Sequence, residues 1–245
     1  MKLSDVNEIY SLLTSQKRAF VPTLDVTEKE YDPKRHKVMD PLIRKRKKIK
    51  VKTDKTDSLT GRPVYKSKYV ERCRTAIPAQ QVLLDRAVGF LFSNEVTYNA
   101  KNECNEQQTQ LFDAVMDCFS ANKIPYFDRR LGRTLGRERE AAELWYYELD
   151  AQGKPSRIRV KLLSPLRGDK LFPHFNDYDK MDGFARLYHT TDESGVVTRH
   201  FDVYTRELVY QYKDSAEGLL TSTGVPKKHG FTKIPVIYYR VEETA

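Results

Sequence analysis

The chain has 245 residues, of which 39% are hydrophobic and 31% charged, with 15 tyrosines and 11 phenylalanines. This composition predicts a globular protein with a core of moderate size and excludes a chain that is disordered throughout. The length allows one large domain, or one domain with an appendage. The three cysteines, Cys73, Cys104 and Cys118, have no CxxC spacing, which argues against a disulfide framework and fits a reducing compartment.

The formal net charge is +9 at pH 7, and one segment accounts for it. Residues 34–55 carry eleven Lys and Arg residues against two acids, Asp40 and Asp54, so this segment alone has an excess of nine positive charges. The remaining chain is close to neutral. The excess positive charge is therefore confined to one segment and is not spread over the whole surface.

The N-terminus does not resemble an export signal. Asp5 and Glu8 stand where a signal peptide is apolar, and the apolar stretch at residues 87–92 is far too short to cross a bilayer. We expect neither a secreted nor a membrane-spanning protein.

The first 70 residues predict little regular structure. Residues 5–16 have the apolar spacing of a short amphipathic helix. From about residue 17 to residue 70, prolines and the basic segment interrupt any periodicity, although the weak alternation at residues 42–52 allows an exposed strand or an arm. We expect residues 1–70 to form a helix and a basic, partly mobile arm.

Helices and then strands are predicted in the rest of the chain, residues 71–245. Apolar residues three or four positions apart predict helices at about 78–92, 105–122 and 125–142, with a short strand at 96–98 after the first. The other predicted strands are 143–149 and 157–163 around a turn at 151–154, 184–189 and 196–204 around a turn at 192–195, 208–212, and 234–239. The predicted fold class is α+β, with N-terminal helices followed by an antiparallel β meander, and with a long irregular basic excursion.

Motifs for catalysis are few. The sequence has no GxxxxGK[ST] loop for nucleotide phosphates. Gly132 and Gly136 lie within a predicted helix, where close helix packing or a weak point in the helix is a simpler interpretation than phosphate binding. Arg159 occupies the position, two residues before Lys161, where a restriction-type nuclease needs an acid.

Metal-binding patterns also fail. The acidic stretch at residues 176–183 has Met181 and Asp182 where an EF-hand loop needs an oxygen ligand and a glycine, so an Asp/Asn-rich turn is the better interpretation. His189 and His200 fall on facing strands of one predicted hairpin but lack a third ligand. Cys118 lies on the apolar stripe of a helix and is interpreted as a core residue. The sequence therefore predicts no metal, no cofactor and no enzymatic activity.

The basic run is the strongest candidate contact site. Its cations could neutralise nucleic-acid phosphates, contact an acidic neighbouring subunit, or form a solvated loop, and the sequence leaves these three alternatives open. The run itself has no interleaved aromatic residues, so base stacking is not implied. The candidate contact residues are Arg44, Lys45, Arg46, Lys47, Lys48, Lys50 and Lys52.

Several sequence phrases follow one another in a characteristic order. They are the helix end Phe90-Leu91-Phe92-Ser93-Asn94-Glu95-Val96, the helices at 107–122 and 127–143, Trp145-Tyr146-Tyr147, Gly153-Lys154 with Leu163-Ser164-Pro165, Pro173-His174-Phe175 leading to the strand at 183–189, the hairpin at 199–204, and Gly230 with Lys233-Ile234-Pro235-Val236-Ile237-Tyr238-Tyr239. In this order, over about residues 70–240, they resemble the wing region of tailed-bacteriophage portal proteins of the SPP1-like siphovirus family. Glu95 stands where the family has a proline, and residues 34–55 have no counterpart there.

The resemblance implies a structural subunit of the portal ring at a capsid vertex, through which DNA is packaged and ejected, and no enzyme. It implies as partners further copies of the chain in a dodecameric ring, the terminase large subunit, scaffold, capsid and head-completion proteins, and the DNA that passes through, with no membrane. It also implies localisation in the virion after assembly in the bacterial host cytoplasm.

In portals the stem, clip and crown follow the matched region. We therefore expect this chain to be the N-terminal, wing-region part of a longer protein, and no channel-lining residue is carried over. The alternative hypothesis is a nucleic-acid-binding or nucleic-acid-processing protein that uses the basic segment at residues 34–55.

Overall fold

The computed structural model describes residues 6, 10, 11, 24–43, 45–100, 104–214 and 220–241, with the backbone alone for residues 24–26. The chain divides into two compact units, residues 1–24 with 85–245, and residues 25–84, which are described separately. The helix predicted at residues 5–16 falls mostly outside the described residues, of which Val6, Tyr10 and Ser11 are helical. The division expected at residue 70, and the mobility expected before it, stay predictions.

Helices and antiparallel sheets make up the described residues, as the α+β class predicts. The helices are α2 (Leu24–Tyr31), α3 (Ala79–Leu91), α4 (Glu106–Ala121) and α5 (Ile124–Glu138), with 3-10 turns η1 (Lys37–Met39) and η2 (Pro165–Arg167). The strands are β1 (Lys47–Thr56), β2 (Pro63–Val70), β3 (Glu140–Leu149), β4 (Pro155–Leu163), β5 (Lys170–Phe175), β6 (Met181–Thr191), β7 (Val197–Tyr204), β8 (Leu208–Asp214), β9 (Leu220–Ser222), β10 (Lys227–Lys228) and β11 (Val236–Arg240).

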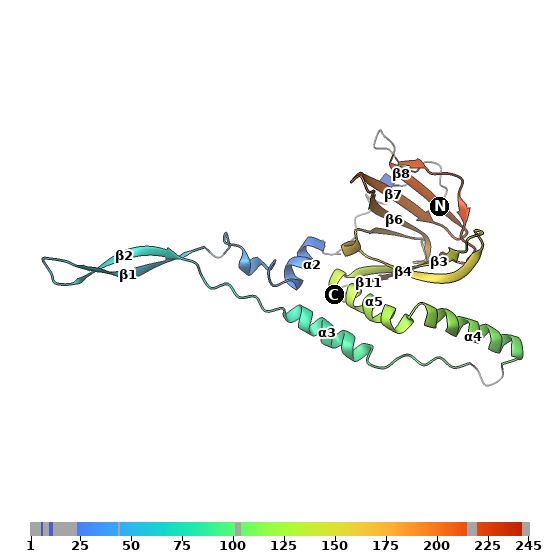
Figure 1. Cartoon of the computed structure of the whole chain (residues 1–245), viewed down its shortest axis with the longest axis horizontal. Coiled ribbons are helices and arrows are strands. Elements are labelled where there is room, and N and C mark those ends of the chain that lie inside the picture. The colour runs from blue at the N-terminus through green and yellow to red at the C-terminus, as the bar shows by residue number, and fades with distance from the viewer. Residues whose placement is uncertain are drawn as a thin grey trace. The chain divides into compact units, whose positions relative to one another are not determined.

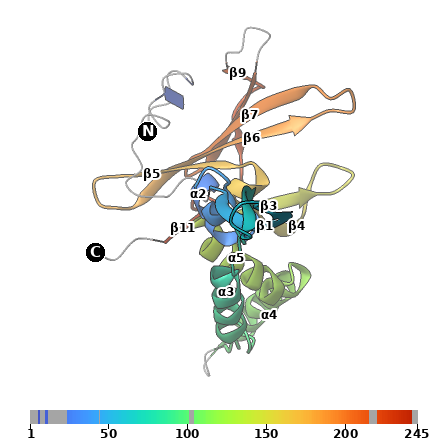
Figure 2. The same ribbon diagram turned by 90° about the vertical axis from the view of Figure 1, so that its left-hand side faces the viewer.

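The larger unit is built of layers, which Figures 1 and 2 show from two sides. Within the described residues, one sheet has six strands in the order β10-β8-β7-β6-β5, with β9 also paired to β8, and another has three strands in the order β11-β3-β4. One face of the three-stranded sheet packs on the six-stranded sheet, and its other face packs on α5.

The alternation of side chains along β6 explains how one sheet serves two cores. Phe184 is buried between the two sheets with Leu163 and Leu171. Ala185 and Leu187 point to the opposite face because successive strand residues alternate. There they pack with Phe201, whose ring lies edge-on to the Tyr10 ring at 5.4 Å between centroids. Val6 and Tyr10 thus pack against this face of the six-stranded sheet.

Capping interactions fix the ends of α4. The side chain of Asn105 accepts a hydrogen bond from the Gln108 backbone at 2.8 Å, and the Gln108 side chain accepts one from the Asn105 backbone at 3.0 Å. At the other end, the Asn122 amide donates to the carbonyl of Ile158 at 2.9 Å and accepts from the backbone of Val160 at 3.1 Å. Asn122 therefore joins α4 to strand β4 by a bidentate contact.

A buried ion pair lies where the two sheets meet. Nε of Arg186 is 2.7 Å from Oδ1 of Asp169, and their side chains are only 9% and 3% exposed. The other oxygen of Asp169 accepts a hydrogen bond from the backbone of Ser164, and the Arg186 guanidinium lies 3.9 Å from the centroid of the Tyr188 ring. The pair thus joins β6 to the segment that connects β4 and β5.

A second carboxylate faces the same guanidinium. Asp202 of β7 is the direct cross-strand partner of Arg186. Burial raises the pKa of Asp202, and the nearby Arg186 charge opposes that rise. Burial likewise lowers the pKa of Lys161, on β4. The polar residues between the sheets therefore depend on one another for charge compensation.

One helix prediction needs correction. The helix predicted at residues 125–142 ends at Glu138, because Arg139 adopts a left-handed conformation (φ 65°) and its N–H closes the helix on the Leu135 carbonyl. The chain then enters β3, where Ala141 and Ala142 pair with β11. Sheet pairing thus overrides the helical propensity of the two alanines. The helices predicted at 78–92 and 105–122 are confirmed as α3 and α4.

The strand predictions were mostly confirmed, with three exceptions. The strand predicted at residues 96–98 is wrong: no strand among the described residues pairs with this segment, and the Tyr98 ring instead lies edge-on to Phe119 at 5.3 Å. The periodicity analysis missed β5, a strand with Pro173 in its middle and at the end of its sheet, where a missing N–H is tolerated. It also missed the short strands β9 and β10.

Replacing Arg186 with Met should lower the free energy of unfolding by about 3–5 kcal/mol, because two buried carboxylates lose their counter-charge. The pKa of Asp202, which burial already raises, would then rise further, so the loss should be largest at neutral pH and shrink as the pH falls and Asp202 becomes protonated. Urea denaturation at several pH values measures this.

The matched control is Arg133→Met, which removes an exposed ion pair with Asp85 whose side chains are 54% and 45% exposed. This change should cost less than about 1 kcal/mol at any pH. Equal losses in the two variants would contradict the role given to the buried pair.

Candidate functional site

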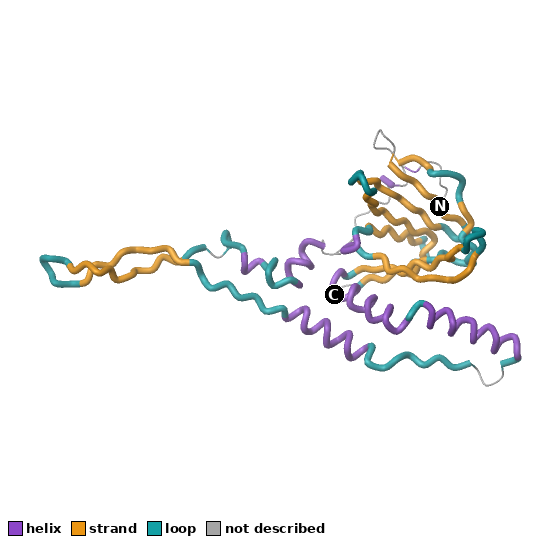
Figure 3. The backbone as a smooth tube through the Cα atoms, viewed as in Figure 1, coloured by secondary structure: helices purple, strands orange, loops and turns teal. Residues whose placement is uncertain are grey.

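The basic segment forms a β-hairpin in the smaller unit. Strands β1 and β2 pair antiparallel and appear as a two-stranded ribbon in Figures 1 and 3. The hairpin turn is closed by Asp57, whose backbone N–H donates to the Arg62 carbonyl, while Gly61 takes the left-handed conformation (φ 64°) that the turn needs. The expectation that residues 17–70 are irregular is thus wrong for the described part. Of the two alternatives for residues 42–52, a strand or an arm, the structure shows a strand that begins at Lys47.

The register gives the hairpin two different faces. Lys48, Lys50 and Lys52 lie opposite Tyr69, Ser67 and Tyr65, so these six residues share one face, here called the Lys–Tyr face. Its two tyrosines are 63% and 57% exposed. The other face carries Lys47, Lys66 and Lys68 together with Ile49 and Val51.

The predicted contact residues do not all lie on one surface. Arg44 lies outside the described residues, and Lys45 and Arg46 precede β1. Nε of Arg46 is 2.6 Å from Glu71, which also pairs with Arg74 at 2.8 Å. The hydrogen bond from Arg46 lowers the pKa of Glu71. Arg46 therefore serves first to close the base of the hairpin, and Lys47 points to the face opposite Lys48, Lys50 and Lys52.

Sequence reasoning missed the contribution of the second strand. Lys66 and Lys68 add to the charge, and Tyr65 and Tyr69 supply the aromatic rings that the basic run itself lacks. The sequence Pro-Val-Tyr-Lys-Ser-Lys-Tyr-Val at residues 63–70 could have indicated this second strand, because it is rich in β-branched and aromatic residues. Only the pairing of β1 with β2 shows that the tyrosines share a face with three lysines.

The hairpin concentrates positive charge without a core to bury. Residues 45–74 hold twelve Lys and Arg residues against three acids. Every residue of β1 and β2 is exposed or half-buried. A two-stranded hairpin is only marginally stable alone. The segment is therefore suited to gain order from a partner rich in negative charge.

The other candidates from the sequence take ordinary structural roles. Asn176 accepts hydrogen bonds from the backbones of Tyr178 and Lys180, so residues 176–183 contain the Asx-type turn expected. The His200 ring stacks on the Tyr188 ring at 4.9 Å between centroids, and its Nε2 is 2.8 Å from the Thr190 hydroxyl. On the facing strand β6, His189 lies opposite Arg199 in the strand register, not opposite His200. Cys118 is half-buried beside the carbonyl of Ile158.

Neither a metal centre nor a membrane span is found in the part of the chain that the structure describes. Among these residues no three His, Cys, Asp or Glu side chains group as metal ligands. No helix of the described ranges is long and apolar enough to cross a membrane. The feature that stands out among the described residues is the exposed, positively charged hairpin.

The chain belongs to the family described as phage portal protein, SPP1 Gp6-like. The sequence model of this family matches residues 11–245. This match confirms the resemblance drawn from the order of sequence phrases. The family is structural: its members assemble as oligomeric rings, are components of the phage capsid and take part in DNA packaging. The search of curated proteins gave no match.

Proposed function

We propose that this protein is a non-enzymatic subunit of a dodecameric portal ring at one capsid vertex, through which DNA is packaged and ejected. The observation that carries the proposal is the family match over residues 11–245. The layered larger unit supports a structural role, since the charged groups buried between its sheets compensate one another. No metal or cofactor is required for such a role.

The partners follow from the same proposal. Each subunit binds further copies of itself to form the ring. The terminase large subunit, scaffold, capsid and head-completion proteins dock on that ring. It assembles in the cytoplasm of the bacterial host and remains in the virion. No membrane contact is proposed.

Quantitative mass spectrometry of purified virions tests the ring role. Peptides of this chain should be present in the copy number of one dodecamer per particle, far below that of the major capsid protein. The control is a tail protein of known copy number from the same particles. Absence from virions, or an abundance equal to that of the capsid lattice, would overturn the proposal.

A second candidate function, nucleic-acid binding by the hairpin, is favoured by the Lys–Tyr face. Three lysines spaced along one side of β1 can neutralise successive phosphates, and phosphate contacts of this kind supply sequence-independent affinity. Tyr65 and Tyr69 add rings on which exposed bases can stack. The combination suits a backbone contact that does not depend on base sequence.

Changing Lys48, Lys50 and Lys52 to Thr should weaken retention of duplex DNA and reduce the log–log salt slope by about 3 units, at about 0.9 per phosphate contact. Threonine is chosen because it keeps the strand propensity of β1. The measurement is DNA affinity over a salt series.

The matched control changes Lys47, Lys66 and Lys68, on the opposite face, to Thr. It removes the same charge and should leave most of the slope in place. Melting curves of both variants should match that of the parent chain, because the lysines are exposed. Equal losses in both variants would show a diffuse electrostatic effect, and unchanged retention in both would eliminate the hairpin as a nucleic-acid contact.

A further inference from the structure

The end of α3 exposes two large apolar side chains. Phe90 is 84% exposed and Leu91 is 70% exposed, although the helix around them is well formed. Two adjacent apolar side chains of this size that stay exposed are candidates for a contact with another molecule. We call Phe90 and Leu91 the apolar knob.

Contacts within the larger unit fix the direction of this knob. Val88, two residues before Phe90, is the buried residue of α3. The Phe92 ring lies against Gly132 of α5, where a Cβ atom would come within 2.6 Å of it, and Arg129 donates to the Phe92 carbonyl at 3.2 Å. Successive helix residues are about 100° apart, so Phe90 points away from the side on which Val88 packs. Phe90 therefore projects from the side of α3 opposite Val88, and the contact of the adjoining Phe92 with α5 holds this end of the helix in place.

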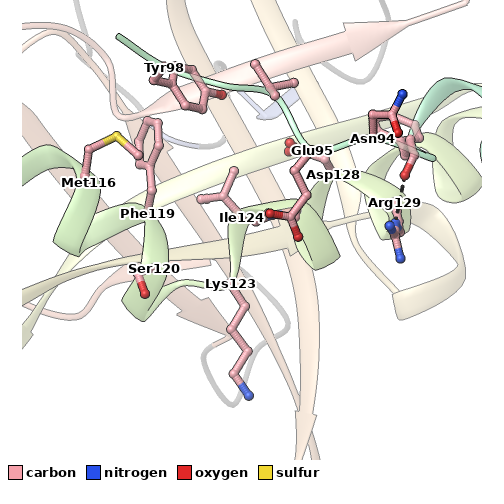
Figure 4. Close-up of a pocket in the computed structure, with 13 residues that line it drawn as sticks. Asn94, Glu95, Tyr98, Met116, Phe119, Ser120, Lys123, Ile124, Asp128 and Arg129 are labelled. Carbon is pink, nitrogen blue, oxygen red and sulfur yellow. Dashed lines mark hydrogen bonds between the residues drawn. The ribbon is translucent and has the colours of Figure 1, made fainter. Parts of the chain in front are cut away.

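A hollow begins one residue beyond the knob, at Phe92. It has a volume of about 320 Å³ and lies between residues 92–98, the end of α4 and the start of α5 (Figure 4). Its apolar lining includes Val96, Tyr98, Met116, Phe119 and Ile124. Asp128 also lines it, and burial raises the pKa of this carboxyl. The hollow is large enough for an aromatic ring and a leucine side chain.

We propose that the apolar knob of one copy of this chain inserts into the hollow of the next copy in the ring. The proposal rests on ring assembly, because a closed ring needs two different, complementary surfaces on each subunit. The exposed knob and the unfilled apolar hollow are such a pair, and both are present on every copy. A contact of this size is smaller than a whole stable interface, so it is one of several contacts that close the ring.

The experiment uses two variants that each block one surface. Phe90→Gln with Leu91→Gln removes the knob and keeps the hollow, and glutamine preserves helix propensity. Val96→Asp places a charge in the hollow and keeps the knob, at a residue that is 65% exposed and so adds little to the core. The control, Tyr178→Gln with Val225→Gln, changes two apolar side chains that are 90% and 85% exposed elsewhere on the unit.

Sedimentation equilibrium of the full chain, from micromolar to near-millimolar concentration, is the measurement. The parent chain and the control should associate, and each blocked variant should associate at least roughly tenfold more weakly, as expected when an aromatic hot spot is lost. A mixture of the two blocked variants should associate one to one and more tightly than either variant alone, since one variant keeps the knob and the other keeps the hollow. Recovery in the mixture also shows that both variants are folded.

Two outcomes would overturn the inference. If the blocked variants associate as the parent does, or their mixture does not dimerise, the subunits meet elsewhere and the ring role still stands on the virion copy number. If the parent chain stays monomeric throughout, the knob and hollow do not form this contact. The virion measurement decides the ring role independently of this result.

Discussion

The larger unit depends on the charge balance around Arg186. One guanidinium faces Asp169 and Asp202 between two sheets, where an uncompensated carboxylate would be strongly destabilising. The pair fixes the six-stranded sheet to the segment that links β4 and β5, and so to the three-stranded sheet. Helix α5 packs on the far side of that sheet, and the positions of α4, the hollow and the end of α3 follow from it. The proposed ring contact is thus placed by a buried polar interaction several layers away.

The positive charge is kept apart from this core. The hairpin and its flanking residues hold twelve basic residues between Lys45 and Arg74, against three acids. Because β1 and β2 bury little, their faces are free to be specified by function rather than by packing. A portal subunit built in this way combines a layered core with an exposed, positively charged hairpin.

Hydrophobic periodicity was enough to predict α3, α4 and most strands of the meander, because those segments bury one face. It failed where tertiary pairing decides. The sequence predicts a helix at Ala141 and Ala142, but pairing with β11 holds both residues in strand β3. It predicts a strand at residues 96–98, but no described strand pairs with them. The basic run was identified from charge alone, whereas its tyrosine neighbours depend on the register of β1 with β2. The knob and the hollow are likewise defined by side-chain exposure and packing, which cannot be determined from a single sequence.

Amide hydrogen exchange on the full chain tests most directly the separation of a stable core from a weakly stable basic hairpin. Amides of β6 and β7 should exchange only through global unfolding, whereas those of β1 and β2 should exchange far faster, since the hairpin buries almost nothing. Adding duplex DNA at low salt should slow exchange in β1 and β2 and leave β6 and β7 unchanged. Equal protection of both regions without any partner would contradict the account.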